Sequence, residues 1–313
     1  MTSCSTMETA TRRVTTDTNV LVLGGTGMLG SMLVDVFSRA EGIAVRATCR
    51  REGQPRQQKV RGKPVEWILF DAVTDEPIDL LVQQAWVFNA IGIIKPLIRE
   101  SDPQDVRRAV VINSLFPYRL ADAAAEAGAR VIQIGTDCVY SGREGKYTER
   151  SPHDALDVYG KTKSLGEVVA PHVLNLRCSI VGPEVRGHRS LLSWFLGQPN
   201  AATIKGFANH LWNGLTTLHF AEIVLGLIRR KTLLAGTYHL IPADTVSKAQ
   251  LLAEFASAFG RTDIRIDQID VPEKIDRTLA TVTPSANADF WHGSGRAAVP
   301  TIREMVRELA AHR

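Results

Sequence analysis

A glycine-rich turn near the amino terminus constrains the fold of this chain more than any other sequence feature. The segment Gly24-Gly25-Thr26-Gly27-Met28-Leu29-Gly30 follows a short apolar run, Val20–Leu23, and precedes a helix-like segment. A tight turn between a buried strand and a helix lets the backbone approach a phosphate closely, and the positive end of the helix dipole attracts that anion. The turn therefore predicts a dinucleotide-binding site. The residues expected to line it are Gly24, Thr26, Gly27, Met28, Leu29 and Gly30.

Short β-branched or apolar runs alternate with helix-like segments over the first 182 residues. Strands that alternate with helices are typical of right-handed crossover units, which build a parallel sheet covered on both faces. We therefore expect an α/β fold with a doubly wound parallel sheet of the Rossmann type and a smaller C-terminal substrate lobe. The expected strands are Val20–Leu23, Ala44–Thr48, Val65–Phe70, Trp86–Asn89, Val131–Ile134 and Val173–Leu176.

Helices are indicated by apolar residues at helical spacing and by residues that begin or end helices. The helix after the glycine turn, whose apolar face includes Leu33 and Phe37, is expected to end at Gly42. Pro103 begins a longer helix that runs to about Gly128. Later in the chain we expect helices over Leu218–Arg229 and Lys248–Phe259, with a short strand over Gly236–Leu240 between them.

Changes in composition divide the chain into three parts. Residues 1–18, which are rich in Thr, Ser and Arg, are expected to form a mobile tail, and residues 19–182 the cofactor-binding Rossmann domain. Residues 183–313 are expected to form mainly the substrate lobe, and parts of them can return to the Rossmann domain. The second boundary rests on Pro and Gly residues that interrupt the strand–helix alternation after Gly182.

Composition argues against several classes of protein. The longest apolar runs fall short of the ~20 residues that span a bilayer, so no membrane partner is expected. The net charge is only +4 and the arginines are scattered, which argues against a nucleic-acid partner. Four cysteines without paired or metal-ligand spacing favour a reducing, cytoplasmic setting and no metal site.

The end of the expected second strand bears on the choice of dinucleotide. NAD-specific sites usually carry an Asp or Glu there, which binds the ribose hydroxyls, whereas this chain has Thr48-Cys49-Arg50-Arg51. Two guanidinium groups suit a 2′-phosphate, because Arg binds phosphate with paired, charge-assisted hydrogen bonds. Arg50 and Arg51 therefore favour NADP(H) over NAD(H). The alternative is that both are surface arginines without a function.

Two further strand ends fall at the carboxyl edge of the expected sheet, where ligands of such sheets bind. Asp71 follows the third strand and is expected to reach the adenine. Ala90, Ile91 and Gly92 follow the fourth strand and are expected to contact the cofactor. The alternative for these residues is simple turn chemistry, because Asp and Gly also close strands for local reasons.

A tyrosine and a lysine four residues apart carry the expected chemistry. Tyr159 and Lys163 share one face of a helix at this spacing. A phenol with a pKa near ~10 becomes a useful acid–base group when an adjacent ammonium lowers its pKa. Thr136, at the end of the expected fifth strand, can offer its hydroxyl to a carbonyl oxygen. The alternatives are a solvated helix face for the pair and a strand-end cap for Thr136.

Together, the glycine turn, Thr136, Tyr159 and Lys163 have the order and approximate spacing of the extended short-chain dehydrogenase/reductase family, which the chain resembles from Val20 onward. The resemblance implies that Thr136 polarises the substrate oxygen and that Tyr159 transfers the proton. It also implies that Lys163 tunes Tyr159 and binds the nicotinamide ribose, and that Asn113 supports the lysine through water.

The string Ile134-Gly135-Thr136-Asp137-Cys138-Val139-Tyr140-Ser141-Gly142 most resembles the dTDP-4-dehydrorhamnose reductase branch of that family, and the residues from Leu176 to Gly182 extend the match. One position departs from it, since Ile180 stands where that branch tends to have a Trp of the sugar site. The resemblance implies that NADPH reduces the C4 ketone of a nucleotide-linked, dTDP-type 4-keto-6-deoxyhexose. The expected ligands are thus NADPH and a nucleotide sugar, and the sequence is compatible with a homodimer.

Three competing functions belong to the same fold. Nucleotide-sugar dehydratases need an Asp followed by a Glu, whereas Asp137 is followed here by Cys138, which cannot protonate a leaving hydroxyl. Epimerases hold NAD tightly, whereas Arg50 and Arg51 favour NADPH. A non-catalytic NADP(H)-binding regulatory subunit, as in methionine adenosyltransferase, remains an alternative because the reductase branch resembles it.

Substrate contacts are expected from residues on both sides of the domain boundary. The stretch from His210 to Thr217 mixes a large ring with hydrogen-bonding groups, so Trp212 and Asn213 are candidates, although Trp212 suits the core equally well. The full set of candidates for the substrate is Asp137, Cys138, Ile180, Trp212 and Asn213, and candidates for its diphosphate are Arg177, Arg186 and Arg189.

Overall fold

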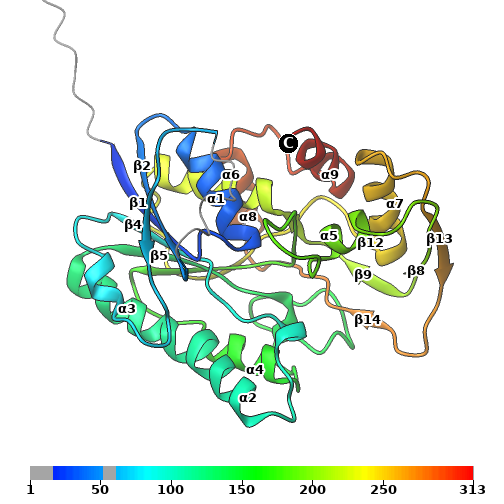
Figure 1. Cartoon of the computed structure of the whole chain (residues 1–313), viewed down its shortest axis with the longest axis horizontal. Coiled ribbons are helices and arrows are strands. Elements are labelled where there is room, and N and C mark those ends of the chain that lie inside the picture. Colours follow the sequence, from blue (N-terminus) through cyan, green and yellow to red (C-terminus); the bar gives the residue numbers. More distant parts are fainter. Residues whose placement is uncertain (1–16, 52–60, 313) are drawn as a thin grey trace, which may run out of the picture.

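A seven-stranded sheet forms the centre of the computed structural model, which describes residues 17–51 and 61–312 (Figure 1). The strand order is β11-β6-β5-β4-β1-β2-β3, and every neighbouring pair is parallel. This arrangement confirms the expected doubly wound α/β fold. The strands are β1 (Thr18–Leu23), β2 (Ile43–Cys49), β3 (Glu66–Leu69), β4 (Trp86–Asn89), β5 (Arg130–Ile134), β6 (Val173–Arg177) and β11 (Gly236–His239).

The central strands are apolar throughout because both faces of the sheet are covered by helices. Successive side chains of a strand point to opposite faces, so Val20 and Val22 belong to one core and Leu21 and Leu23 to the other. Helices α1 (Met28–Ser38) and α6 (Thr217–Arg229) pack on the first face, and α3 (Phe116–Ala127) packs on the second. Residues far apart in sequence thus share one core.

The long helix expected from Pro103 to Gly128 is interrupted. Helix α2 (Pro103–Ala109) is followed by a π-helical turn over Val110–Leu115 and then by α3, which ends with Gly128 at φ 68°. Proline has no N–H to donate, so Pro117 cannot bond to the carbonyl of Asn113 four residues earlier. The backbone widens at this point, and such turns are frequent at functional sites.

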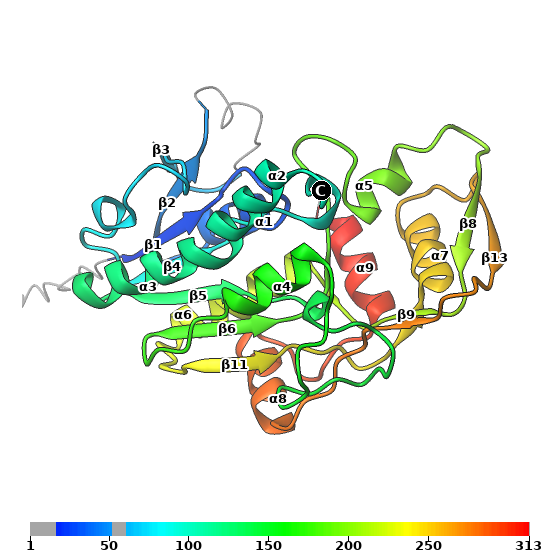
Figure 2. The ribbon, with the colours of Figure 1, turned by 90° about the horizontal axis from the view of Figure 1, so that it is seen from below.

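A smaller lobe lies beside the carboxyl edge of the sheet (Figure 2). Its short strands pair as β8 with β13, as β12 and β14 with β9, and as β10 with β7. The elements of this part of the chain are β7 (Ile180–Val181), α5 (Leu191–Leu196), β8 (Thr203–Phe207), β9 (His210–Trp212), β10 (Leu215–Thr216), β12 (Val246–Ser247), α7 (Lys248–Ala258), β13 (Arg265–Ile269), β14 (Ile275–Asp276), α8 (Pro284–Gly293) and α9 (Ile302–Ala311).

Part of the C-terminal sequence returns to the main sheet. Strand β11 pairs with β6 at the edge of that sheet, and α6 packs against α1. Several boundaries differ slightly from the sequence expectation. Strand β1 begins at Thr18, inside the expected tail, of which residues 1–16 lie outside the described residues. Helix α1 ends at Ser38, and Gly42, at φ 72°, forms the turn before β2. Helix α7 ends one residue before Phe259.

Four further helical segments lie in the first 182 residues. Helix α4 (Val158–Leu165) follows β5, and short 3-10 turns span Pro77–Leu80, Lys95–Leu97 and Asp137–Val139. Over residues 17–51 and 61–312, none of the helices combines the length and the apolar character that a membrane crossing requires.

Candidate active site

The glycine turn lies between β1 and α1, and its backbone leaves room for glycine alone at two positions. Gly24 adopts φ 78°, a left-handed conformation that side chains disfavour. A Cβ on Gly30 would lie 2.1 Å from the carbonyl oxygen of Gly24. Gly27 precedes the first turn of α1 and donates its N–H to the same carbonyl oxygen at 3.0 Å. The expected strand, turn and helix therefore occur together.

The turn is tied to the end of β2, where the expected 2′-phosphate residues follow. The N–H of Gly24 donates to the hydroxyl of Thr48, and the N–H of Gly25 to its carbonyl oxygen, both at 2.9 Å. Arg50 and Arg51 come directly after β2 and are exposed. The sequence analysis did not assign roles to Thr48 and Gly25, because the hydrogen bonds between the glycine turn and Thr48 join segments that are far apart in sequence.

The loop after β4 lies against the glycine turn. A Cβ on Gly24 would be 3.1 Å from Cγ1 of Ile91 and 3.3 Å from the carbonyl carbon of Ala90. A Cβ on Gly92 would lie 3.5 Å from Oδ1 of Asn113, so this loop connects the turn to the π-helical segment. Asp71 lies at the same edge and accepts the N–H of Val73 at 2.9 Å, which is the local turn chemistry considered as its alternative.

The three expected catalytic residues lie together at the end of β5. Tyr159 and Lys163 stand on α4, whose first turn is capped by Asp157 through the N–H of Gly160 (2.8 Å). The Lys163 ammonium donates to the carbonyl oxygen of Ile134, the last residue of β5, at 2.9 Å. The Thr136 side chain, two residues beyond that carbonyl, is close enough to the Tyr159 phenol to oppose the rise in its pKa.

Burial changes the acid–base character of both α4 groups. It raises the pKa of the Tyr159 phenol above its ordinary value and lowers the pKa of Lys163 to about 8. The nearby charge of Glu167 opposes the second effect by raising the pKa of Lys163. The sequence analysis expected the lysine to lower the pKa of Tyr159. In the structure the pKa of the phenol is raised, because burial raises it and the neighbouring Cys138 and Asp137 add to that effect.

Asn113 supports α4 through protein contacts. Its Oδ1 accepts the N–H of Ile93 at 2.8 Å, and its Nδ2 donates to the carbonyl oxygen of Ile93 at 3.0 Å and to the hydroxyl of Thr162 at 3.2 Å. A Cβ on Gly166 would clash with the Asn113 carbonyl oxygen at 1.9 Å, so the chain after α4 passes directly over the π-helical turn. Asn113 therefore positions the helix next to Lys163.

The residues after Thr136 form a buried, polar end to the site. The N–H of Cys138 donates to the hydroxyl of Thr136 at 3.2 Å, and the Cys138 thiol contacts Oδ1 of Asp137 at 3.6 Å. Burial raises the pKa of Asp137 and raises that of Cys138 to about 12, so the thiol is neutral. Lys248 and Arg277, which the sequence analysis did not single out, act electrostatically on Asp137 from the smaller lobe.

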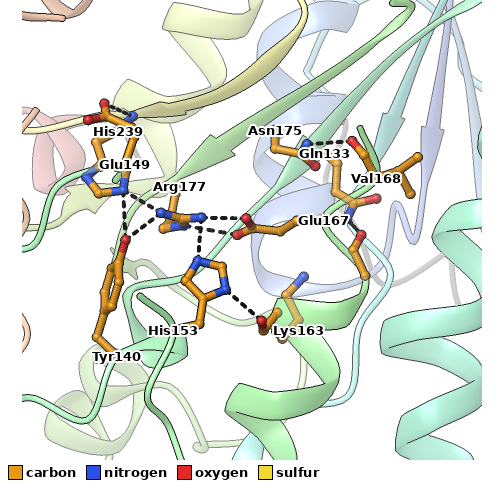
Figure 3. Close-up of polar contacts among 12 residues, drawn as sticks. Gln133, Tyr140, Glu149, His153, Lys163, Glu167, Val168, Asn175, Arg177 and His239 are labelled. Atoms are coloured by element: carbon orange, nitrogen blue, oxygen red, sulfur yellow. Dashed lines mark hydrogen bonds and ion pairs between the residues drawn. The ribbon is translucent and has the colours of Figure 1, made fainter. Parts of the chain in front are cut away.

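Arg177 is not a ligand for a diphosphate, which corrects one sequence expectation. The side chain lies at the end of β6 with 2% exposure, and its guanidinium bonds Glu167 twice, at 3.0 and 2.5 Å (Figure 3). Its remaining contacts reach the Tyr140 hydroxyl at 2.6 Å, the His239 ring at 2.7 Å and the His153 ring at 2.9 Å. The group is fully engaged inside the protein. Arg186 and Arg189 are exposed before α5.

Three of the expected substrate residues serve the junction between the lobes. Trp212 is buried in the main core and donates its indole N–H to the Ser179 hydroxyl at 2.8 Å. Asn213 bonds both backbone groups of Leu279, at 2.9 and 2.7 Å, and so uses its amide internally. Ile180 in β7 packs against the same core. These placements match the core alternative for Trp212.

Residues 18–283 match the family described as RmlD substrate binding domain. The chain belongs to this family. The expected resemblance to the reductase branch of the extended short-chain dehydrogenases is thereby confirmed. This member of the RmlD family is 30% identical over 148 residues to methionine adenosyltransferase 2 subunit beta from Rattus norvegicus, an alignment that covers 47% of this chain and 41% of that protein.

Two further comparisons extend the likeness. The RmlD-family chain is 32% identical over 155 residues to dTDP-4-dehydrorhamnose reductase of Streptomyces griseus, covering 49% of this chain and 45% of the reductase. The alignments with the rat protein and with this reductase therefore each span less than half of the relative's length. The fold also matches the solved dTDP-4-dehydrorhamnose reductase of Bacillus anthracis in complex with NADP, with a TM-score of 0.70, 15% identity, and coverage of 95% of this chain and 100% of that one.

Proposed function

We propose that this protein is an NADPH-dependent ketoreductase that reduces the C4 ketone of a nucleotide-linked 4-keto-6-deoxyhexose, with dTDP as the expected nucleotide. The observation that carries the proposal is the gathering of Thr136 and Tyr159 beside the buried Lys163, whose ammonium donates to the Ile134 carbonyl oxygen at 2.9 Å. These groups lie at the carboxyl edge of the parallel sheet, where ligands of doubly wound folds bind. The membership of the RmlD family supports the same reaction class.

The residues at the carboxyl edge fit NADP(H). A Cβ on Gly24 or on Gly30 would crowd the backbone of the glycine turn, so these positions require glycine. The N-cap residue of α1 has no side chain that bonds to the N–H groups of the first turn. A pyrophosphate placed there would receive those N–H groups. Arg50 and Arg51 would take the 2′-phosphate, and Ile91 and Gly92 would flank the cofactor. When bound, NADPH supplies the hydride.

The protein groups hold the substrate oxygen and deliver the proton. Thr136 and Tyr159 would both bond the ketone oxygen, which polarises the carbonyl group. Because burial raises the pKa of Tyr159, the phenol stays protonated at neutral pH and can donate its proton as negative charge develops on that oxygen. The ammonium of Lys163, fixed on the Ile134 carbonyl, would stabilise the phenolate that remains.

The neutral thiol of Cys138 supports reduction over dehydration. A dehydratase needs an acid at this position to protonate a leaving hydroxyl, and a thiol with a pKa of about 12 is a poor proton donor. The likeness to the beta subunit of methionine adenosyltransferase favours one second candidate, an NADP(H)-binding regulatory subunit without catalysis. The two candidates differ in whether Tyr159 is needed for anything beyond folding.

The deciding experiment follows NADPH and NADH oxidation with a panel of dTDP- and UDP-linked 4-keto-6-deoxy sugars. We expect turnover with NADPH, and loss of turnover with unchanged NADP+ binding in Tyr159→Phe. The matched control is Tyr118→Phe, because Tyr118 lies exposed on α3 and should be dispensable. A Tyr159→Phe protein that still turned over normally would refute the mechanism, and silence across the panel with tight NADP+ binding would favour the regulatory role.

A further inference from the structure

The ion pair between Glu167 and Arg177 packs against the end of β5, next to the contact made by Lys163. A Cβ on Gly135 would lie 3.2 Å from Oε1 of Glu167 and 3.0 Å from Cα of Arg177, so both residues press on the Gly135 backbone. Gly135 directly follows Ile134, whose carbonyl oxygen accepts the Lys163 ammonium at 2.9 Å. The carboxylate and the ammonium therefore flank the same short piece of backbone (Figure 3).

Lys163 and Glu167 are four residues apart, the spacing at which opposite charges pair readily on helical turns. The structure pairs the carboxylate with Arg177 instead, whose guanidinium occupies both of its oxygens, at 3.0 and 2.5 Å. The Lys163 ammonium is left on the Ile134 carbonyl oxygen. The charge of Glu167 still acts on Lys163 and raises the pKa of the ammonium. Arg177 and Lys163 thus compete for one carboxylate.

The guanidinium of Arg177 is held from its other side by three rings. It donates to the Tyr140 hydroxyl at 2.6 Å, to the His239 ring at 2.7 Å and to the His153 ring at 2.9 Å. Burial lowers the pKa of His239 to about 4, so this ring is a neutral acceptor at neutral pH. Glu149 adds a second negative charge that acts on the guanidinium. These contacts leave Arg177 a single position.

His239 connects Arg177 to chain that comes from the smaller lobe. A guanidinium can only donate, so Nε2 of His239 accepts, and the ring proton on Nδ1 is donated to the carbonyl oxygen of Ala280 at 2.6 Å. The N–H of His239 donates to Glu149 at 2.9 Å, and the same carboxylate accepts the hydroxyl of Thr281 at 2.6 Å. Ala280 and Thr281 lie between β14 and α8, so elements of both lobes fix the guanidinium.

We propose that Arg177 is a positioning residue, which holds the Glu167 carboxylate away from Lys163 and so keeps the ammonium on the Ile134 carbonyl oxygen. The inference rests on the proposed function, in which that ammonium stabilises the phenolate of Tyr159. Without Arg177 the buried carboxylate would lack its partner, and the ammonium four residues away would turn to it. Arg177 therefore acts through Glu167 and Lys163, and not on the substrate.

The test follows the ionisation of Lys163 by NMR in full-length protein labelled with 13C at the lysine ε-carbon, where the Lys163 signal is the one absent from Lys163→Met. We expect Arg177→Gln to raise the pH at which Lys163 titrates by about one pH unit or more, because an unpaired carboxylate nearby favours the charged ammonium. NADP+ binding, measured by calorimetry, should weaken roughly tenfold as the ammonium leaves its place. Arg177→Lys, which keeps a cation for Glu167, should restore most of both properties.

A double substitution separates this role from a purely structural one. In Arg177→Gln combined with Glu167→Gln, the carboxylate that would capture Lys163 is gone. NADP+ binding should therefore recover relative to Arg177→Gln alone, and Lys163 should titrate at a lower pH than in that single variant. A purely structural role predicts instead that the second loss in the core adds to the first. The double variant also leaves neither charge of the pair buried alone, which favours its folding.

A milder variant keeps the test decisive if Arg177→Gln does not fold. His239→Leu removes one acceptor from Arg177 and leaves both charges paired, so it should raise the titration pH of Lys163 by a smaller amount. Arg108→Met is the matched control and should change nothing, because Arg108 lies exposed on α2.

The inference would be overturned by an unchanged or lowered titration pH of Lys163 in Arg177→Gln. If that variant does not fold, the same result in His239→Leu would overturn it. A double variant that binds NADP+ no better than Arg177→Gln would also count against it. Because both readouts are taken without a sugar nucleotide, they stand even if no substrate is turned over. Loss of the inference in turn leaves the Tyr159→Phe result, and hence the proposed function, untouched.

Discussion

Glu167 and Arg177 form a buried ion pair beside Lys163, the lysine of the proposed mechanism, with Oε1 and Oε2 of the carboxylate 3.0 and 2.5 Å from the guanidinium. Arg177 comes from the end of β6 and Glu167 from the segment after α4, so the pair connects the helix of Tyr159 to the sheet. The charge of Glu167 also raises the pKa of Lys163. One interaction thus bears on both the stability of the fold and the charge state of Lys163.

Glu167→Gln should destabilise the protein strongly. The substitution leaves the Arg177 charge buried without its counter-ion, a change that typically costs about 3–5 kcal/mol. Chemical denaturation followed by circular dichroism measures the free energy of unfolding. Glu126→Gln is the matched control, because Glu126 is exposed on α3 and its loss should change the free energy of unfolding by less than about 0.5 kcal/mol. Equal effects of the two variants would contradict a stabilising role for the pair.

Activity should fall as the pH rises through about 8. Burial lowers the pKa of Lys163 from its ordinary value of 10.5 to about 8, so the ammonium is charged below that pH and neutral above it. The alkaline limb of the pH profile of kcat/KM for NADPH-dependent reduction reports this loss of the Lys163 charge. In Glu167→Gln, where the supporting negative charge is gone, the limb should move to lower pH. A limb that stays in place or moves upward would show that another group controls it.

The preference for NADPH should depend on the two arginines after β2. Arg50→Ala and Arg51→Ala should each weaken NADPH binding roughly tenfold or more, as expected for a charge-assisted contact to phosphate, and leave NADH binding nearly unchanged. Fluorescence titration with NADPH and with NADH measures the ratio of the two dissociation constants. Arg143→Ala provides a control, since Arg143 is exposed on the loop after Tyr140, remote in sequence from β2. If the ratio of the two affinities stays constant, the 2′-phosphate is bound elsewhere.

Local patterns predicted the main sheet and the proximity of the candidate catalytic residues. Apolar runs that are buried on both faces mark parallel strands, and all six strands expected in the first 182 residues are present within two residues of their expected ends. Tyr159 and Lys163 are four residues apart on one helix, and Thr136 follows a strand, so neighbouring sequence was enough to bring them together. Each of these relationships is set by contacts within one element or between consecutive elements.

Contacts between distant segments could not be predicted in the same way. The interruption of the helix at Asn113 depends on Pro117, yet the sequence alone does not show that Gly166, directly after α4, would pass over the freed carbonyl of Asn113. Arg177 has the composition of a phosphate ligand, and only its position at the end of a buried strand turns it inward. Lys248 and Arg277 are brought to Asp137 by the folding of the smaller lobe, over more than 100 residues of sequence.

The glycine turn should lose stability and cofactor binding when a side chain is added at Gly30, its closest backbone contact. A Cβ on Gly30 would lie 2.1 Å from the backbone oxygen of Gly24, which cannot move without breaking the turn, whereas a Cβ on Gly27 would lie 3.3 Å from the same atom. Gly30→Ala should therefore lower the free energy of unfolding by about 1–3 kcal/mol through overpacking and abolish NADP+ binding, and Gly27→Ala should have the smaller effect on stability. Thermal melts with and without NADP+ measure both quantities. Equal destabilisation by the two variants would mean that the helix does not pack on the turn as closely as its backbone indicates.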